Sequence, residues 1–188
     1  MENKEQDNLA LIANMITVAR REFNDKSYIY LIWGWAVCIC ALAEYVLLKM
    51  GKEYHPVVWL VLPFVSVVQF IISRKKTGNE RVTTHMDRVM SYVWTAVLVS
   101  MVIILVSQGV MQQSSYPALI ILYGIGTYIS GSIMNLTIMR VGAVCCWVIA
   151  LVAFYVSFEY QLLLLSLSLI LSYIIPGHLL KLRFKNNV

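Results

Sequence analysis

The chain has 188 residues, of which 60% are apolar and 13% charged, and its mean hydropathy is +0.72. Soluble globular domains have an apolar fraction of about 45–50%, so this composition excludes an ordinary soluble domain and indicates a protein embedded in lipid. The formal net charge of +5 indicates basic residues at cytoplasmic helix ends rather than nucleic-acid binding, because no basic groove or base-stacking motif accompanies it.

Residues 1–27 are predicted to form an amphipathic helix and a short lead-in. Apolar residues recur there at spacings of three and four, namely Leu9, Ile12, Ile16, Ala19 and Phe23. We expect this helix to lie on the cytoplasmic membrane surface or under the bundle, where it orients the first span; binding of a protein partner is the alternative. The acidic and polar start, MENKEQDN, predicts that no cleaved signal peptide is present.

Six apolar segments follow, each close to the roughly 20 residues that a helix needs to cross a hydrocarbon core. They cover residues 28–49, 56–73, 89–111, 117–139, 141–158 and 161–180. Backbone groups in lipid must pair within their own segment, and no period-two alternation favours a β-barrel. The sequence therefore predicts an all-α fold, a six-span transmembrane helical bundle over 28–180, followed by a basic cytoplasmic tail at 181–188.

The basic residues predict the orientation of the bundle. Of the 15 Lys and Arg residues, 13 fall on the side of the termini and only Lys49 and Lys52 fall on the other side. The positive-inside rule then places both termini in the cytoplasm. The longest loop, 74–88, is too small for a soluble catalytic domain. Its charges are expected to orient the chain and attract anionic headgroups, with partner docking as the alternative.

Enzymatic chemistry is disfavoured by the absence of a catalytic motif from the sequence. We find no metalloprotease, lipid-phosphotransferase or phosphate-loop pattern, and we expect no cofactor and no bound metal. The four cysteines, Cys38, Cys40, Cys145 and Cys146, all lie inside apolar runs. They are interpreted as small packing residues rather than as a disulfide framework.

Glu44 is the one ionisable residue well inside an apolar run. At 1.5 Å per residue from Tyr28 it lies about 24 Å along the first span, roughly 5 to 8 Å below the outer boundary. Because a charge in the membrane is costly, an intramembrane acid is a functional candidate by default. A structural glutamate, hydrogen-bonded or protonated, is the alternative.

Two sets of polar residues are predicted at different depths. Ser107, Gln108, Tyr123 and Tyr155 lie at the depth of Glu44 and would form an outward-facing pocket with it if their helices were neighbours. A second set lies toward the cytoplasm: Gln69, Ser132, Asn135, Arg140, Tyr173 and His178. Pro176 is expected to kink or end the sixth span, which would leave His178 near a helix end. The candidate cavity or ligand residues are Glu44, Gln108, Tyr123, Asn135 and His178.

Small residues predict where helices approach closely. In the fourth span Gly124, Thr127 and Gly131 share one stripe and Gly126 and Ser130 another, while Gly142, Cys146 and Ala150 repeat every four residues in the fifth. Such faces supply van der Waals contact between helices in lipid. Packing within the chain is the expected use, and a homodimer contact is the alternative.

Two short parts of the chain carry a family resemblance. Ser27-Tyr28 with Trp33-Gly34-Trp35, and the ending Ile175-Pro176-Gly177-His178, are similar to features of small bacterial integral membrane proteins of uncharacterised activity. The resemblance implies the same architecture and a bacterial inner membrane, and it transfers no functional residue.

Two functions are compatible with this sequence. The first is small-solute transport or sensing through a polar intramembrane cavity, which would explain why an acid and an outer polar set exist at all. The second is a membrane adaptor or regulatory subunit that acts through partner proteins. The sequence favours the first, because a pure scaffold has no need of Glu44.

Overall fold

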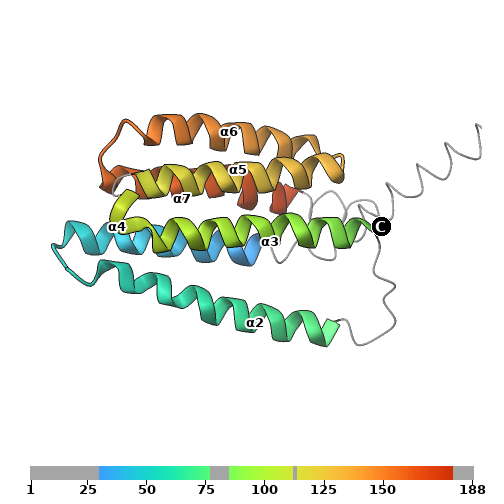
Figure 1. Ribbon diagram of the computed structural model, residues 1–188, viewed down its shortest axis with the longest axis horizontal. Helices are drawn as coiled ribbons and strands as arrows, with labels where there is room; N and C mark the ends of the chain where they lie inside the picture. Colours follow the sequence, from blue (N-terminus) through green and yellow to red (C-terminus); the bar gives the residue numbers. More distant parts are fainter. Residues whose placement is uncertain (1–29, 77–84, 112–113, 180–188) are drawn as a thin grey trace, which may run out of the picture.

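The computed structural model describes residues 30–76, 85–111 and 114–179, and these residues form helices joined by short turns, with no strand among them (Figure 1). The predicted N-terminal amphipathic helix, most of the longest loop and the basic tail lie outside the described residues.

The described helices follow the predicted apolar segments in chain order. A first helix, Tyr30–Lys49, precedes the 3-10 helix η1 (His55–Leu60), which runs directly into α2 (Val61–Lys76). Next come α3 (His85–Val106), the short α4 (Gln108–Met111) and α5 (Ser115–Ile133). The last are α6 (Thr137–Ala153), α7 (Phe158–Leu169) and the π-helical η3 (Ile170–Ile174), after which the helix continues to Leu179. Figure 1 shows the first helix, α3, α5, α6 and α7 with their axes roughly parallel.

Three of the predicted segments differ from the observed helices. The third is interrupted at Ser107, which separates α3 from α4. The fourth, predicted over 117–139, ends at Ile133 before a turn at Asn135, and the next helix begins at Thr137 rather than at residue 141. The fifth ends at Ala153 rather than at residue 158, and the Gln161 side chain of α7 folds back over its end. The Gln161 amide nitrogen donates to the carbonyls of Ala153 and Val156 at 3.1 and 3.2 Å, which satisfies carbonyls that a helix end leaves unpaired.

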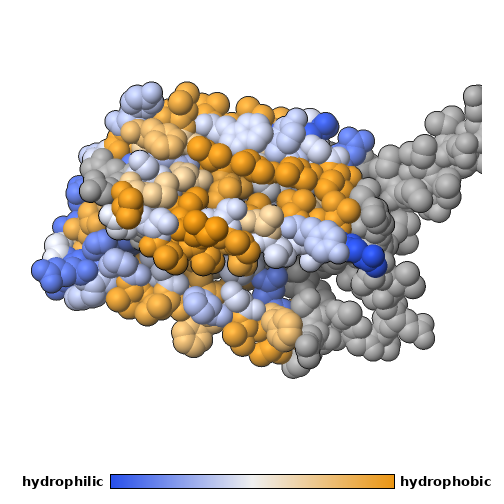
Figure 2. Space-filling view, in the orientation of Figure 1, coloured by the Kyte–Doolittle hydropathy of each residue, from blue (hydrophilic) through white to orange (hydrophobic). Residues whose placement is uncertain are grey.

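Five of the described helices are long and apolar enough to cross a membrane, and α6, with 17 residues, is shorter. The molecule is therefore all-helical and suited to a membrane. Figure 2 agrees, since most of the visible face is apolar and the hydrophilic residues gather toward its two ends.

The core lies between the first helix, α5, α6 and α7. Its buried side chains include Ala41, Ile120, Cys146, Ala150 and Leu162, none of which is exposed to solvent. The second segment is peripheral by comparison, because every residue from His55 to Ile72 is exposed or only partly buried. Figure 1 shows α2 at the edge of the bundle, diverging from the other helices.

The predicted small-residue faces are used inside the chain. A Cβ atom on Gly142 would lie 2.9 Å from the carbonyl oxygen of Leu171 and from the Cα of Ser172, so α6 packs against the backbone of η3. A Cβ atom on Gly126 would lie 3.3 Å from the Trp94 ring on α3. These close approaches supply packing contacts where lipid removes the hydrophobic driving force.

Pro176 does not end the last helix. The turn before it widens into the π-helical η3, in which the Ile175 amide donates to the Ile170 carbonyl. This widening accommodates the missing proline N–H, and the chain stays helical through Leu179.

Candidate functional site

Glu44 is the centre of a buried hydrogen-bonded cluster. The residue is 1% exposed, although it lies in the last two turns of the first helix. The Trp59 indole nitrogen and the Tyr116 hydroxyl both donate to its Oε2 atom, at 2.7 and 2.6 Å. The Nδ1 atom of His55 lies 2.9 Å from its Oε1 atom. Both carboxyl oxygens are therefore bonded to side chains from other elements, and we call these four residues the Glu44 cluster.

The turn after the first helix brings two of the partners into place. Gly51 has φ of 68°, and the amides of Gly51 and Lys52 bond back to the carbonyls of Leu48 and Leu47. This left-handed glycine is the usual way to end a helix and reverse the chain. Pro56, in the first turn of η1, suits that position because its missing N–H has no helical partner there. η1 thus returns along the first helix and carries His55 and Trp59 to Glu44.

Aromatic rings and a neighbouring ion pair enclose the cluster. The Phe158 ring at the start of α7 lies 5.2 Å from the Tyr116 ring and 6.4 Å from the His55 ring, centroid to centroid. Lys49 pairs with Glu159, so its charge is already compensated. Solvent reaches the pair through His55, because its side chain is 24% exposed and that of Glu44 is 2% exposed.

The charge of the cluster depends on one proton. Trp59 and Tyr116 are neutral donors, and a buried carboxylate is stable only when it is paired and hydrogen-bonded. A proton held between Glu44 and His55 makes the pair neutral overall, whichever of the two residues carries it. Without that proton a buried anion would remain.

The other residues predicted at the depth of Glu44 are not its described partners. On α5 the partner is Tyr116 rather than Tyr123, whose ring packs instead against Tyr173 at 5.7 Å. Tyr155 is 84% exposed in the turn after α6. Gln108 begins α4, and its side chain lies outside the described part of the chain.

The residues of the predicted cytoplasmic set do not form one site. Asn135 is exposed in the turn between α5 and α6 with φ of 51°, a conformation that asparagine tolerates better than most residues. His178 is exposed, and its Nδ1 atom lies 2.9 Å from the Ile174 carbonyl one turn earlier. Gln69 accepts a hydrogen bond from the Trp33 indole, which joins α2 to the first helix.

Sequence reasoning missed His55, Trp59 and Tyr116 as partners of Glu44. One signal could have found them. All three are side chains with N–H or O–H groups that stand at the ends of apolar segments on the same predicted side as Glu44. An acid near that boundary needs donors, and the amphipathic rings gathered at a membrane interface supply them.

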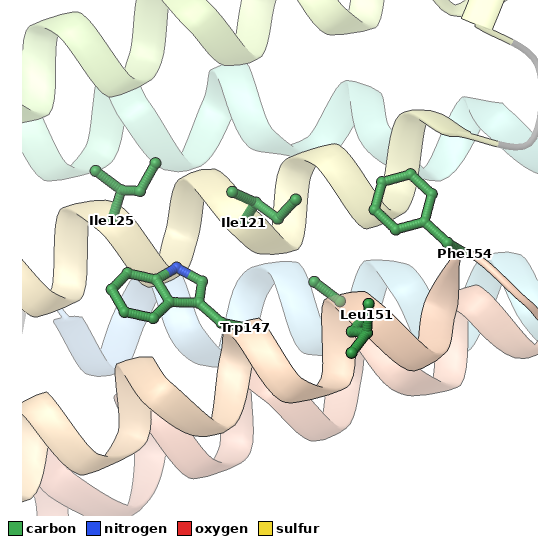
Figure 3. Close-up of a pocket in the computed structure, with 6 residues that line it drawn as sticks. Ile121, Ile125, Trp147, Leu151 and Phe154 are labelled. Atoms are coloured by element: carbon green, nitrogen blue, oxygen red, sulfur yellow. The ribbon is translucent and has the colours of Figure 1, made fainter.

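A separate hollow lies on the surface of α5 and α6. Ile121, Ile125, Trp147, Ala150, Leu151 and Phe154 line it. Figure 3 shows the Trp147 ring between α5 and α6, with Ile121 and Ile125 on α5. Its lining is apolar apart from the Trp147 indole nitrogen, which distinguishes it from the Glu44 cluster.

Within the described ranges no group of three or more His, Cys, Asp or Glu side chains is placed to hold a metal ion. The chain matches no protein family model, no curated protein and no solved structure. The functional argument therefore rests on the geometry of the Glu44 cluster.

Proposed function

We propose that this chain is a six-span protein of a bacterial inner membrane, with both termini in the cytoplasm, that senses protons at the Glu44–His55 pair. The observation that carries the proposal is a buried acid with both oxygens engaged, whose histidine partner is partly exposed at one end of the bundle. Sensing is the part of the transport-or-sensing hypothesis that this geometry supports.

The six-span topology is supported by the lengths and directions of the helices. At 1.5 Å per residue α6 is about 26 Å long, close to the roughly 30 Å of a hydrocarbon core. It is joined to α5 by the tight Asn135 turn and to α7 by residues 154–157, so it reverses direction at both ends. Six alternating helices return the C-terminus to the side of the N-terminus, and the excess of basic residues places that side in the cytoplasm.

Reporter fusions test this topology. Alkaline phosphatase fused after Ser157 should be active and fused after Asn135 should be inactive, and green fluorescent protein fused after Val188 should fluoresce. Equal phosphatase activity at residues 135 and 157 would mean that α6 does not cross the membrane and would overturn the six-span proposal.

Solute passage past Glu44 has less support. Between Tyr116 and Tyr123, about 10 Å apart along α5, the buried face of that helix carries Leu119 and Ile120. These side chains belong to the same apolar core cluster as Val37 and Ala41 of the first helix. An apolar layer thus closes the Glu44 cluster toward the other end of the bundle, which favours a responsive site over a continuous path.

The proposed response is movement of η1 and α2. Described polar contacts hold this segment to the first helix at its two ends: the Glu44 cluster at one end and Trp33 with Gln69 at the other. Apolar side chains pack against lipid about as favourably as against another helix, so the polar contacts decide whether α2 stays docked to the first helix. Loss of the shared proton at higher pH leaves a buried anion and weakens the contact, so docking is favoured at low pH.

Among the residues that the structure describes, the groups that face the pair are otherwise uncharged. They are Cys40 on the first helix, Trp59 on η1, Tyr116 on α5 and Phe158 on α7. The adjacent Lys49–Glu159 pair is neutral in sum. The proton between Glu44 and His55 therefore determines the net charge of this part of the bundle.

Cys40 provides a built-in reporter for docking. Its thiol is 5% exposed and donates to the Val58 carbonyl of η1 at 3.5 Å, so displacement of η1 uncovers it. We expect the rate of its reaction with a membrane-permeable maleimide, resolved by mass spectrometry, to rise more steeply with pH in the natural chain than in a Glu44→Gln variant. Cys146, buried in the core, is the internal control.

The comparison with Glu44→Gln cancels the general effect of pH on thiol reactivity. Equal pH slopes for Cys40 in the two proteins would overturn the sensing proposal. The second candidate function, an adaptor or regulatory subunit, is compatible with a moving α2 but has no described contact of its own. A partner site on the N-terminal helix and a homodimer stay predictions.

A further inference from the structure

His55 has one ring nitrogen that no hydrogen bond engages within the part of the chain that the structure describes. Its Nδ1 atom lies 2.9 Å from the Glu44 Oε1 atom, and Nε2 stands on the other edge of the ring. An ionised carboxylate can only accept hydrogen bonds, so Nδ1 carries the proton of that contact and Nε2 keeps a free lone pair. Nε2 is therefore the atom at which a further proton can bind.

The edge of the Glu44 cluster that borders water is at His55. The His55 side chain is 24% exposed, whereas that of Glu44 is 2% exposed. The turn immediately before it, residues 51–54, is exposed at every position and carries Lys52 and Glu53. Two adjacent charged side chains stay in water rather than in lipid. The turn 51–54 therefore lies at the aqueous boundary, and His55 is the first residue after it.

Toward the other end of the bundle the cluster meets a buried apolar layer. The first helix contributes Val37 and Ala41 to this layer and α5 contributes Leu119 and Ile120, all of them at most 6% exposed. These side chains pack in one buried cluster with Leu162 of α7. The layer separates the pair from the aqueous phase on the side of the termini.

This layer also lacks groups that could carry a proton through it. Residues 30–43 of the first helix and the whole of α5 contain no acidic, basic or histidine side chain. The nearest hydroxyl on α5 beyond the layer belongs to Tyr123, about 10 Å from Tyr116 along the helix. The Tyr123 ring packs against Tyr173, away from the cluster. A proton on Glu44 or His55 thus has no described relay in this direction.

The side chains packed around the pair leave His55 as its contact with water. Among the described residues they are Cys40 of the first helix, Trp59 of η1, Tyr116 of α5 and Phe158 of α7. None of these four adds a charge to the pair. Two charged residues lie at the same end of the bundle, and they form an ion pair with each other, Lys49 with Glu159.

We propose that the Glu44–His55 pair exchanges its proton with one aqueous phase only, the phase at the turn 51–54, opposite the termini. The proton binds at Nε2 of neutral His55, and the imidazolium that forms faces the Glu44 carboxylate, so the anionic pair becomes neutral. Release of the proton from Nε2 to water reverses the step. This inference rests on the proposed sensing function and names the compartment that is sensed. With the termini in the cytoplasm, the chain responds to the pH outside the inner membrane.

Membrane vesicles of both orientations, which contain the full-length protein, test this sidedness. A tag after Val188 gives the orientation, because an added protease removes it only where the C-terminus faces outward. The pH is raised from about 5.5 to about 7.5 on one side at a time, the range in which histidine usually titrates. Cys40 is then labelled with a membrane-permeable maleimide, and its rate is divided by the rate in Glu44→Gln vesicles treated identically. We expect this ratio to rise severalfold when the pH is raised opposite the termini and to stay constant when it is raised on the side of the termini.

The outcomes separate this inference from the sensing proposal. A ratio that rises with the pH on the side of the termini, alone or in addition, would overturn the inference and leave proton sensing intact. A ratio that responds on neither side would overturn the sensing proposal itself. A protonophore is the control, since it removes the pH difference and should make the two steps equivalent. If Glu44→Gln does not fold, His55→Gln, which removes the Nε2 entry atom, serves as the reference.

Discussion

Removing the Tyr116 hydroxyl isolates one hydrogen bond of the Glu44 cluster. Tyr116→Phe keeps the ring, and so keeps its contacts with Trp59 and Phe158, whose centroids lie 6.3 and 5.2 Å away. What is lost is the 2.6 Å hydrogen bond to the Glu44 carboxyl group. The side chain is 2% exposed, so water cannot replace the hydroxyl without disturbing the core.

The expected cost depends on whether Glu44 is ionised. Neutral hydrogen bonds between membrane helices contribute about 0.6 kcal/mol on average. Hydrogen bonds to charged groups contribute about 1.5–3 kcal/mol. We expect Tyr116→Phe to lower the free energy of unfolding by about 2 kcal/mol when Glu44 carries the charge. In a Glu44→Gln background the acceptor is neutral, and the same substitution should cost about 0.6 kcal/mol.

The assay is reversible unfolding in mixed micelles, followed by circular dichroism, for the natural chain, the two single variants and the double variant. The difference between the two Tyr116→Phe costs is the coupling energy of the pair. Tyr155→Phe is the matched control, since that tyrosine is 84% exposed on the same side of the bundle. A cost for Tyr116→Phe equal to that of Tyr155→Phe would refute the reasoning.

Two further substitutions test the packing of α6 and the turn before it. Gly142→Ala should lower the free energy of unfolding by about 1–3 kcal/mol, because the new Cβ atom would stand 2.9 Å from the backbone of η3. Gly109→Ala is the control: a Cβ atom there has nothing within 4 Å, so the free energy of unfolding should change only through helix propensity. Equal effects of the two substitutions in thermal unfolding would contradict the close approach at Gly142. Asn135→Val should lower the free energy of unfolding by about 1–2 kcal/mol, because a β-branched residue is strained at positive φ. Asn135→Gly should be tolerated, because glycine adopts positive φ without strain. A valine variant as stable as the natural chain would mean that the turn adopts another conformation.

Local features of the fold were predictable from the sequence. Hydropathy and segment length placed six apolar helices close to their observed positions, because a helix in lipid satisfies its own backbone and leaves a continuous apolar run. Small-residue spacing likewise marked Gly126 and Gly142 as points of close approach, since a fixed helical period brings such residues onto one face. Glu44 stood out because charge inside an apolar run is costly.

The partners of Glu44 were decided only by the tertiary structure. Depth along a helix can be counted from the sequence, but which helices are neighbours and how each is rotated depend on packing among distant segments. Tyr116 and Tyr123 lie seven residues apart on the buried side of α5, yet only Tyr116 reaches the carboxyl group, because helix spacing places it near the start of η1. His55 and Trp59 reach Glu44 because the Gly51 turn reverses the chain.

The same limit applies to the remaining polar residues. In the sequence Asn135 and His178 lie inside or beside apolar runs. The structure places Asn135 in a turn and His178 one helical turn after Ile174, and each has a local backbone partner. The sequence alone predicted the apolar helices and the ionisable Glu44 within one of them. Contacts between distant segments determined which side chains bond to Glu44.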